Sequence, residues 1–116
     1  MKYAFLLYDN EAGSDESEEM MARWFAVDGE THAAGVNQGG EALNPVATAK
    51  TVRVRGGAPD ITDGPFAETK EEQLGGFYIL ELPDLDAAIE WAKKFPNVET
   101  GSVEIRPVMD FSGMQP

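Results

Sequence analysis

A short stretch in the middle of the chain brings together side chains that could carry out acid–base chemistry. Residues 62–76 contain the turn-forming pair Gly64-Pro65, an aromatic side chain, several carboxylates and a lysine, and they follow neither helical nor strand periodicity. Loops of this kind present functional groups that a rigid scaffold aims. A partly desolvated carboxylate here could act as a general base. The catalytic candidates are Asp63 and, as its partner, Glu68.

Basic and aromatic side chains near this stretch are candidates for holding a ligand. Arg53 and Arg55 alternate along a predicted strand, so they share a face and form a basic spot on an acidic chain. Guanidinium groups bind carboxylates and phosphates in this way, although exposed arginines on strands also pair with neighbouring acids. The ligand-binding candidates are Arg53, Arg55, Phe66, Lys70 and His32.

His32 is the only histidine, so any histidine-dependent mechanism must use it. It lies near the end of a predicted helix, where the helix dipole favours an imidazolium. Two interpretations stay open, a solvated surface histidine and a general base. A Ser-His-Asp hydrolase is not expected, because the sequence has no nucleophile elbow.

Without thiols a metal site would need oxygen ligands, which suit magnesium or manganese rather than zinc, and we predict neither a metal site nor a cofactor.

The central motif also has a purely structural interpretation. Gly64 would supply an unusual φ, Pro65 would fix the next one, and Asp63 would accept backbone N–H groups of the turn. Phe66 would then plug a hole between helix and sheet. Glu68 and Lys70 would form an ion pair across the turn.

Length and composition predict one soluble domain. The chain has 116 residues, of which 42% are hydrophobic and 26% charged, and this balance is typical of folded globular proteins. The net charge of -12 disfavours direct binding to nucleic acid. No apolar run is long enough for a membrane span, the start of the chain lacks a signal-peptide layout, and cysteine is absent, so we expect a cytoplasmic protein without membrane attachment.

Hydrophobic periodicity predicts five core elements, three strands and two helices in alternation. Residues 2–8 form a first strand with Tyr3, Phe5 and Leu7 on one face, and an amphipathic helix follows and ends at Gly35. The same pattern predicts a further strand over residues 75–82 and the last strand over residues 102–108. The helix between them is expected to be capped by Asp84, with a buried stripe of Leu85, Ala88, Ile89, Ala92 and Phe95 and with Trp91 off that stripe, toward a partner.

The middle of the chain predicts a turn and a hairpin. Residues 39–45, rich in glycine, are expected to turn and then run on as a short extended piece. Residues 51–55 alternate strictly, residues 56–59 turn, and residues 60–62 run back, which is typical of a β-hairpin.

This order predicts an α+β fold, a ferredoxin-like split βαβ subunit with an extra central β-hairpin. We expect a single domain over residues 1–110 and a flexible C-terminal tail over residues 111–116. Several strands are apolar on both faces, so the sheet face without helices should pack on a second copy. The sequence therefore predicts a homodimer through the open sheet face.

Several stretches resemble the YCII-related family, specifically its DGPF-motif branch. The most specific are Asp-Gly-Pro-Phe at 63–66, Glu-Thr-Lys-Glu at 68–71 and Leu-Gly-Gly-Phe at 74–77. The turn at 39–43, the strand at 47–55, the helix start at 83–88 and the ending at 101–108 are similar to that branch as well. The resemblance implies a dimeric α+β barrel, a bacterial origin, and genes located near extracytoplasmic-function sigma factors.

Two departures limit what the resemblance implies about the site. Relatives typified by the YCII protein itself carry a histidine early on the first helix with an acidic partner, whereas this chain has Arg23 and Trp24 there. The spacing between Lys70 and Leu74 is one residue longer than the branch pattern. Neither the histidine pair nor the roles of the carboxylates after Lys70 can therefore be carried over.

Three functions stay open at this point. The first is binding or acting on a small molecule in a pocket next to the Asp-Gly-Pro-Phe loop. The second is a protein-interaction module, a regulator linked to sigma factors and transcription through a protein partner. The third is a structural dimer without activity.

Overall fold

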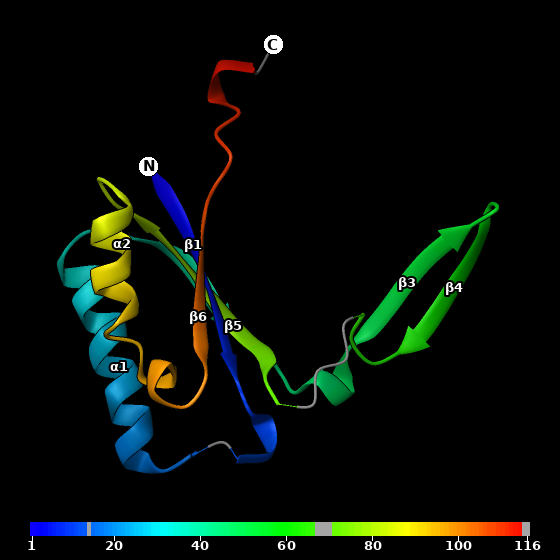
Figure 1. The fold of residues 1–116 in the computed structure, drawn as a ribbon, viewed down its shortest axis with the longest axis horizontal. Helices are drawn as coiled ribbons and strands as arrows, with labels where there is room; N and C mark the ends of the chain where they lie inside the picture. The colour runs from blue at the N-terminus through cyan, green and yellow to red at the C-terminus, as the bar shows by residue number, and fades with distance from the viewer. Residues whose placement is uncertain (14, 67–70, 115–116) are drawn as a thin grey trace.

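Strand β1 (Lys2–Asp9) is an inner strand of the main sheet. The structure is a computed structural model that describes residues 1–13, 15–66 and 71–114. The neighbours of β1 are β5 (Gln73–Glu81) and β6 (Ser102–Pro107), and β2 (Asn37–Ala42) lies beyond β5, so the order is β2-β5-β1-β6 with every pair antiparallel. The two α-helices lie together on one face of this sheet (Figure 1). The predicted ferredoxin-like split βαβ arrangement is confirmed.

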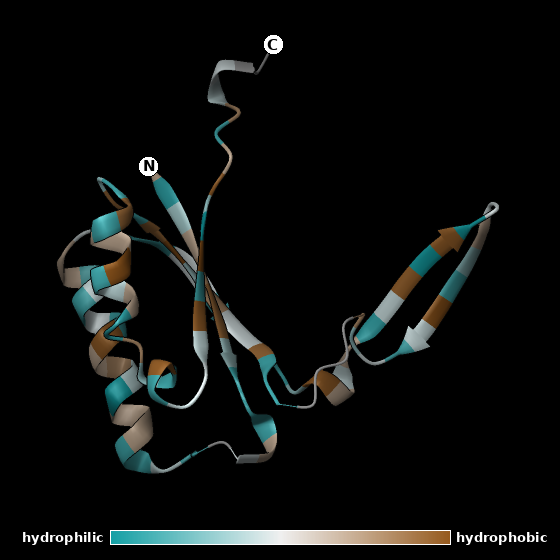
Figure 2. Cartoon of the chain, in the orientation of Figure 1, coloured by the Kyte–Doolittle hydropathy of each residue, from teal (hydrophilic) through white to brown (hydrophobic). Residues whose placement is uncertain are grey.

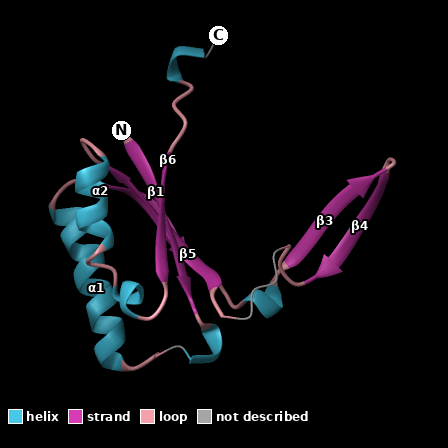
Figure 3. Cartoon of the chain, in the orientation of Figure 1, coloured by secondary structure: helices cyan, strands magenta, loops and turns pink. Residues whose placement is uncertain are grey.

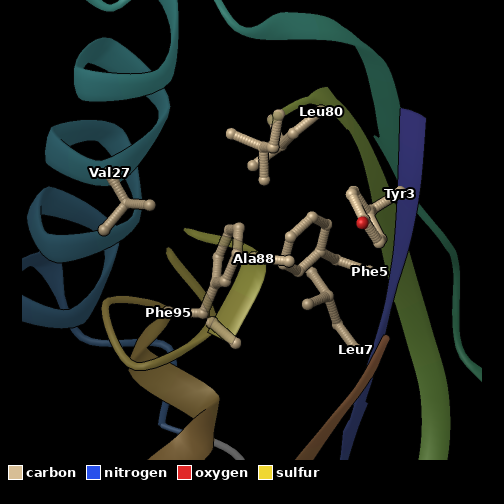
Figure 4. Close-up of a cluster of buried hydrophobic side chains, with 9 residues drawn as sticks. Tyr3, Phe5, Leu7, Val27, Leu80, Ala88 and Phe95 are labelled. Atoms are coloured by element: carbon tan, nitrogen blue, oxygen red, sulfur yellow. The ribbon is translucent and has the colours of Figure 1, made fainter. Parts of the chain in front are cut away.

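The core lies between this sheet and the helices. Tyr3, Phe5 and Leu7 share the helix-facing side of β1 and are buried, as their spacing predicts. Figure 4 shows Phe5 and Phe95 facing one another, and their ring centroids are 5.7 Å apart. Each fully buried side chain of this size contributes about 1.5–3 kcal/mol to folding. The remaining core members are Val27, Leu80, Leu82, Ala88 and Ala92.

Helix α1 (Glu18–Ala33) has a side-chain cap and a glycine stop. The hydroxyl of Ser17 accepts a hydrogen bond from the Met20 backbone N–H. The chain leaves the helix at Gly35, whose φ of 72° lies in the left-handed region that favours glycine. The predicted end of this helix is thereby confirmed.

Helix α2 (Leu85–Ala92) begins where the sequence predicts, because the Asp84 carboxylate accepts from the Ala87 N–H. The predicted stripe is wrong in two members, since Leu85 and Ile89 are exposed. Small Ala88 and Ala92 let the helix approach the sheet closely, which leaves the larger side chains flanking the contact. Trp91 packs against the core and Lys94 lies over its ring, so the prediction that Trp91 lies off the buried stripe is wrong.

The glycine-rich segment predicted as a turn is the edge strand β2. Asn37–Ala42 pairs with β5 and contains a bulge between Asn37 and Gly40. The segment has almost no apolar side chains, so periodicity could not identify it. It forms a strand because the free edge of β5 offers backbone partners and because Gly40 and Gly76 let the two backbones approach.

The predicted hairpin is confirmed as β3 (Lys50–Arg55) and β4 (Ala58–Asp63). Gly56 and Gly57, with φ of 58° and 80°, make the two-residue turn, so Ala58 and Pro59 belong to the strand rather than to the turn. The two strands form a separate sheet. We call residues 50–63 the arm, and Figures 1 and 3 show it extending from the side of the four-stranded sheet that the helices leave open.

Short 3-10 turns connect these elements. They are Glu11–Gly13, Val46–Thr48, Pro96–Glu99 and Ser112–Met114. Of the helices in the described part of the chain, none has both the length and the apolar character needed to cross a bilayer.

Candidate functional site

A cleft of about 660 Å³ opens between helix α1 and the β2–β5 side of the sheet. One wall consists of side chains that recur along one face of α1, and the floor consists of backbone and small side chains of β2 and β5. The volume is in the range of small-molecule sites. The α1 residues in the lining are Met21, Trp24, Phe25, Asp28 and His32.

Small residues on the helix-facing side of the sheet create this space. Gly40 stands opposite Tyr78 and Ala42 opposite Gly76 in the β2–β5 pairing, where larger side chains would fill the cleft. A Cβ on Gly40 would lie 2.4 Å from the Phe77 carbonyl oxygen. Any other residue at this position would therefore force the backbone to shift. Close pairing of the two strands therefore requires glycine, and the cleft is a consequence.

Asp28 is the polar centre of the cleft. Its Oδ1 accepts a 2.8 Å hydrogen bond from the hydroxyl of Tyr78, and its Oδ2 lies 3.5 Å from Nε2 of His32, one helical turn further along α1. All three residues line the cleft. We refer to them as the Asp28 cluster.

Burial raises the pKa of Tyr78 to about 12, and its hydrogen bond to Asp28 and the charge of that carboxylate act in the same direction. Tyr78 therefore stays protonated at neutral pH. Its proton is committed to Asp28, so its oxygen lone pairs are what it can offer to a bound molecule.

Packing and hydrogen bonds hold the Asp28 cluster in place. The hydroxyl of buried Thr31 donates to the Asp28 backbone carbonyl at 2.7 Å and accepts from the Asn37 amide at 3.0 Å, which ties α1 to the start of β2. The Tyr78 ring lies 5.2 Å from that of Phe95, which is fully buried in the core. The site therefore stands on rigid elements.

The lining combines an apolar aromatic wall with negative charge. Trp24, Phe25 and Met21 supply the wall, and Phe25 is exposed. Asp9 and Glu41 add carboxylates to that of Asp28, and the described residues of the lining include no lysine or arginine. Such a cleft favours uncharged or cationic molecules over anions.

The structure brings one predicted site residue to the cleft and places four others on or beside the arm. His32 lines the cleft, whereas the described lining includes none of Asp63, Arg53, Arg55 and Phe66. Asp63 is exposed and forms an ion pair with Lys50 across the arm, and within the described residues it accepts no backbone N–H of the turn. The unusual φ predicted for Gly64 is confirmed, at 97°.

Phe66 does not plug a hole between helix and sheet. Its side chain is 75% exposed, and the guanidinium of Arg53 lies 4.8 Å from its ring centroid. The predicted burial is wrong because the chain at Phe66 is next to the arm, which stands away from the core (Figure 1). The candidates Glu68 and Lys70 lie outside the described residues.

Sequence reasoning missed Asp28 and Tyr78. One signal was present: Asp28 and the only histidine are four residues apart on a predicted helix, which places both side chains on one face. Tyr78 carried no such signal, because only the fold brings β5 opposite this turn of α1. Within the described residues, no group of three His, Asp or Glu side chains converges as a metal site would require.

Comparison with known proteins identifies the family. The model of the YCII-related domain matches residues 1–112. The chain belongs to the YCII-related family. A relative in Rhizobium meliloti (strain 1021), named as an uncharacterized protein, is 38% identical over 115 residues, which cover 93% of this chain and 92% of that protein.

A solved structure has a similar fold. It is 5-chloro-2-hydroxyhydroquinone dehydrochlorinase from Burkholderia phenoliruptrix AC1100 in complex with 2,5-dihydroxybenzoquinone. The match has a TM-score of 0.51 and 12% sequence identity and covers 94% of each chain. At this identity the likeness concerns the fold alone, an antiparallel sheet with two helices on one face, as the sequence predicts.

Proposed function

We propose that this YCII-related protein binds a small, uncharged or cationic ring compound that carries a hydroxyl group, and moves a proton on it, in the α1–β2–β5 cleft. The observation that supports this most strongly is the Asp28 cluster: one carboxylate that accepts from Tyr78 at 2.8 Å and lies 3.5 Å from His32, inside an apolar cleft. Paired titratable groups in a cleft, with a shifted pKa among them, are typical of functional sites.

The proposed chemistry gives each member a role. Asp28 orients the imidazole of His32 through the Nε2–H of that ring. The Nδ1 atom of His32 then takes a proton from the hydroxyl of the bound ring compound. The Tyr78 oxygen accepts a hydrogen bond from the ligand. Trp24 and Phe25 hold the ring by stacking and apolar contact. The 3.5 Å separation suits an unliganded site, since such contacts tighten when the ligand binds.

Two further facts support the ligand class. The lining has carboxylates but, in its described part, no lysine or arginine, so a carboxylated ring would be repelled. The structural neighbour acts on a hydroxylated ring, as its name states. That neighbour's activity is a guide to the class of molecule to test, not to the reaction.

Nuclear magnetic resonance titration tests the ligand class. Hydroquinone and 4-hydroxybenzoate share a phenol ring and differ at the para position, where the first has a hydroxyl group and the second a carboxylate. Hydroquinone should shift the indole N–H signal of Trp24, which lines the cleft, and leave that of Trp91 unchanged. The carboxylated compound should shift Trp24 less at equal concentration. Equal shifts from both compounds, or no shift of Trp24 by either, would contradict the proposal.

We also propose that the protein is a homodimer through the open sheet face. Ala4, Leu6, Phe77 and Ile79 lie on that face, where no helix of the described chain covers them, and each stays partly exposed. A contiguous apolar sheet face of this kind is typical of an interface. A location in the cytoplasm and the absence of a nucleic-acid partner remain part of the proposal.

The Asp-Gly-Pro-Phe stretch is a second candidate site. It would use Asp63 as a base or acceptor and Glu68 as its partner, with Arg53, Arg55, Phe66 and Lys70 holding the ligand. What favours it is the contact of Arg53 with the exposed ring of Phe66, which presents a cation beside an aromatic surface. A substitution of Asp63 separates this candidate from the cleft, as described in the Discussion.

A further inference from the structure

The arm has one apolar face that nothing in the described chain covers. Val52 pairs with Ile61 and Val54 with Pro59, so these four side chains share a face, while Arg53, Asp60 and Thr62 lie on the other. Val52, Val54 and Ile61 are 62%, 58% and 66% exposed. Figure 2 shows the alternation of apolar and polar residues along both strands.

An amphipathic hairpin with two strands is at best marginally stable in water by itself. Its ladder and the Thr51 hydroxyl, which donates to the Gly64 carbonyl at 2.7 Å, hold only the arm's own ends together. A definite conformation of the arm therefore requires something that covers the apolar face.

The dimensions of the chain show how much surface lacks cover. Its radius of gyration is 16.5 Å, whereas a compact domain of this length has about 13 Å. Its accessible surface is 8223 Å², whereas a compact monomer of this mass exposes about 6,200 Å². The excess is of the size that a stable protein–protein interface buries.

Position and charge indicate which partner covers it. The arm extends on the side of the open sheet face (Figure 1), so a second copy packed on that face would lie next to the arm. The arm carries three basic and two acidic side chains, whereas the whole chain carries 9 basic and 21 acidic ones. The body of another copy is thus complementary in charge to the arm.

We infer that the arm is a dimerisation arm, whose apolar face packs on the body of a second copy of this chain. The inference rests on the proposed packing through the open sheet face. In a two-fold dimer each subunit gives one arm and receives one, so both uncovered apolar surfaces are buried in a single assembly.

A matched pair of neighbouring substitutions tests the arm. Ile61→Asp places a charge on its apolar face, and Thr62→Asp places the same charge on its polar face. By sedimentation equilibrium at micromolar concentration, the unchanged protein should be a dimer. Ile61→Asp should raise the dissociation constant of the dimer at least about tenfold, whereas Thr62→Asp should leave it within about threefold.

A second variant guards against local misfolding of the arm. Replacing residues 51–62 by a short glycine–serine linker should keep the circular dichroism of the body and weaken the dimer as Ile61→Asp does. If the dimer tolerates both Ile61→Asp and the linker, the inferred role of the arm is contradicted, while the proposed dimer through the sheet face is not. A monomeric unchanged protein would overturn both.

Proximity gives an independent readout, because the chain contains no cysteine. A Thr62→Cys chain carrying a spin label is mixed with ¹⁵N-labelled unmodified chain, so any broadening of ¹⁵N signals arises between copies. Broadening of body signals supports the inference. Absence of broadening in a dimeric sample contradicts it.

Discussion

The hydroxyl of Tyr78 on β5 donates a 2.8 Å hydrogen bond to Asp28 on α1, joining sheet and helix across the floor of the cleft. This bond fixes the carboxylate whose other oxygen faces His32. Stability and the proposed ligand site therefore depend on the same contact.

Tyr78→Phe should lower the free energy of unfolding by about 1–2 kcal/mol at neutral pH, because a hydrogen bond to a carboxylate is lost. The pKa of Tyr78 is raised in the folded state from 10.0 to about 12, so the folded state holds its proton more tightly. The stability from this group is thus complete below pH 10 and is lost as the pH rises toward about 12.

Urea unfolding at a series of alkaline pH values measures this effect. The advantage of the unchanged protein over Tyr78→Phe should shrink across that window, and Tyr8→Phe, on the other face of β1, serves as the control. An advantage that stays constant through pH 12 would show that the Tyr78 hydroxyl is not tied to Asp28.

Two glycines should respond in opposite directions to alanine. Gly40→Ala forces a Cβ against the Phe77 carbonyl at a φ of 156°, so it should destabilise the protein by about 2–4 kcal/mol. Gly29 is exposed within α1 and no described residue lies within 4 Å of its Cβ position, so Gly29→Ala should stabilise by about 0.5–1 kcal/mol. Thermal unfolding of both variants checks the pair, and a well-tolerated Gly40→Ala would refute the close β2–β5 approach.

The fold was largely predictable, and the reason is visible strand by strand. β1 and β5 contain short apolar runs, β6 alternates apolar and polar residues, and Ser17 and Asp84 cap their helices as such residues usually do. β2 was not predictable, because its glycines carry no hydrophobic pattern and its strand conformation comes from pairing with β5.

The site was less predictable than the fold. His32 was recognised as a candidate, but its environment depends on Tyr78, which is distant in sequence. Phe66 was expected in the core because aromatic side chains usually are buried, whereas its neighbourhood belongs to the arm. A single sequence indicates which side chains could do chemistry, and the fold decides which of them meet.

A charge on the open sheet face should dissociate the proposed dimer. Ile79 lies on that face, and Ile89 is a 40% exposed isoleucine on α2 at the opposite side of the sheet. Ile79→Glu should therefore shift the sedimentation mass at micromolar concentration toward one chain, while Ile89→Glu should leave it unchanged. Equal masses for the two variants would place the interface elsewhere.

Asp63→Asn separates the two candidate sites. Because the pair with Lys50 is exposed, its loss should cost at most about 1 kcal/mol of folding stability. If the cleft is the ligand site, the shift of the Trp24 indole signal by hydroquinone should be the same in this variant. A loss of that shift in a folded Asp63→Asn protein would favour the Asp-Gly-Pro-Phe stretch instead.

The most direct test of the central claim is hydroquinone affinity in Asp28→Asn, followed through the Trp24 indole signal. Glu30→Gln is the matched control, because it makes the same carboxylate-to-amide change on α1 at a residue paired with Lys94 outside the described lining of the cleft. Asp28→Asn should weaken binding about ten- to a hundredfold, and Glu30→Gln should not change it. Equal affinities in the two folded variants would contradict a ligand site centred on Asp28.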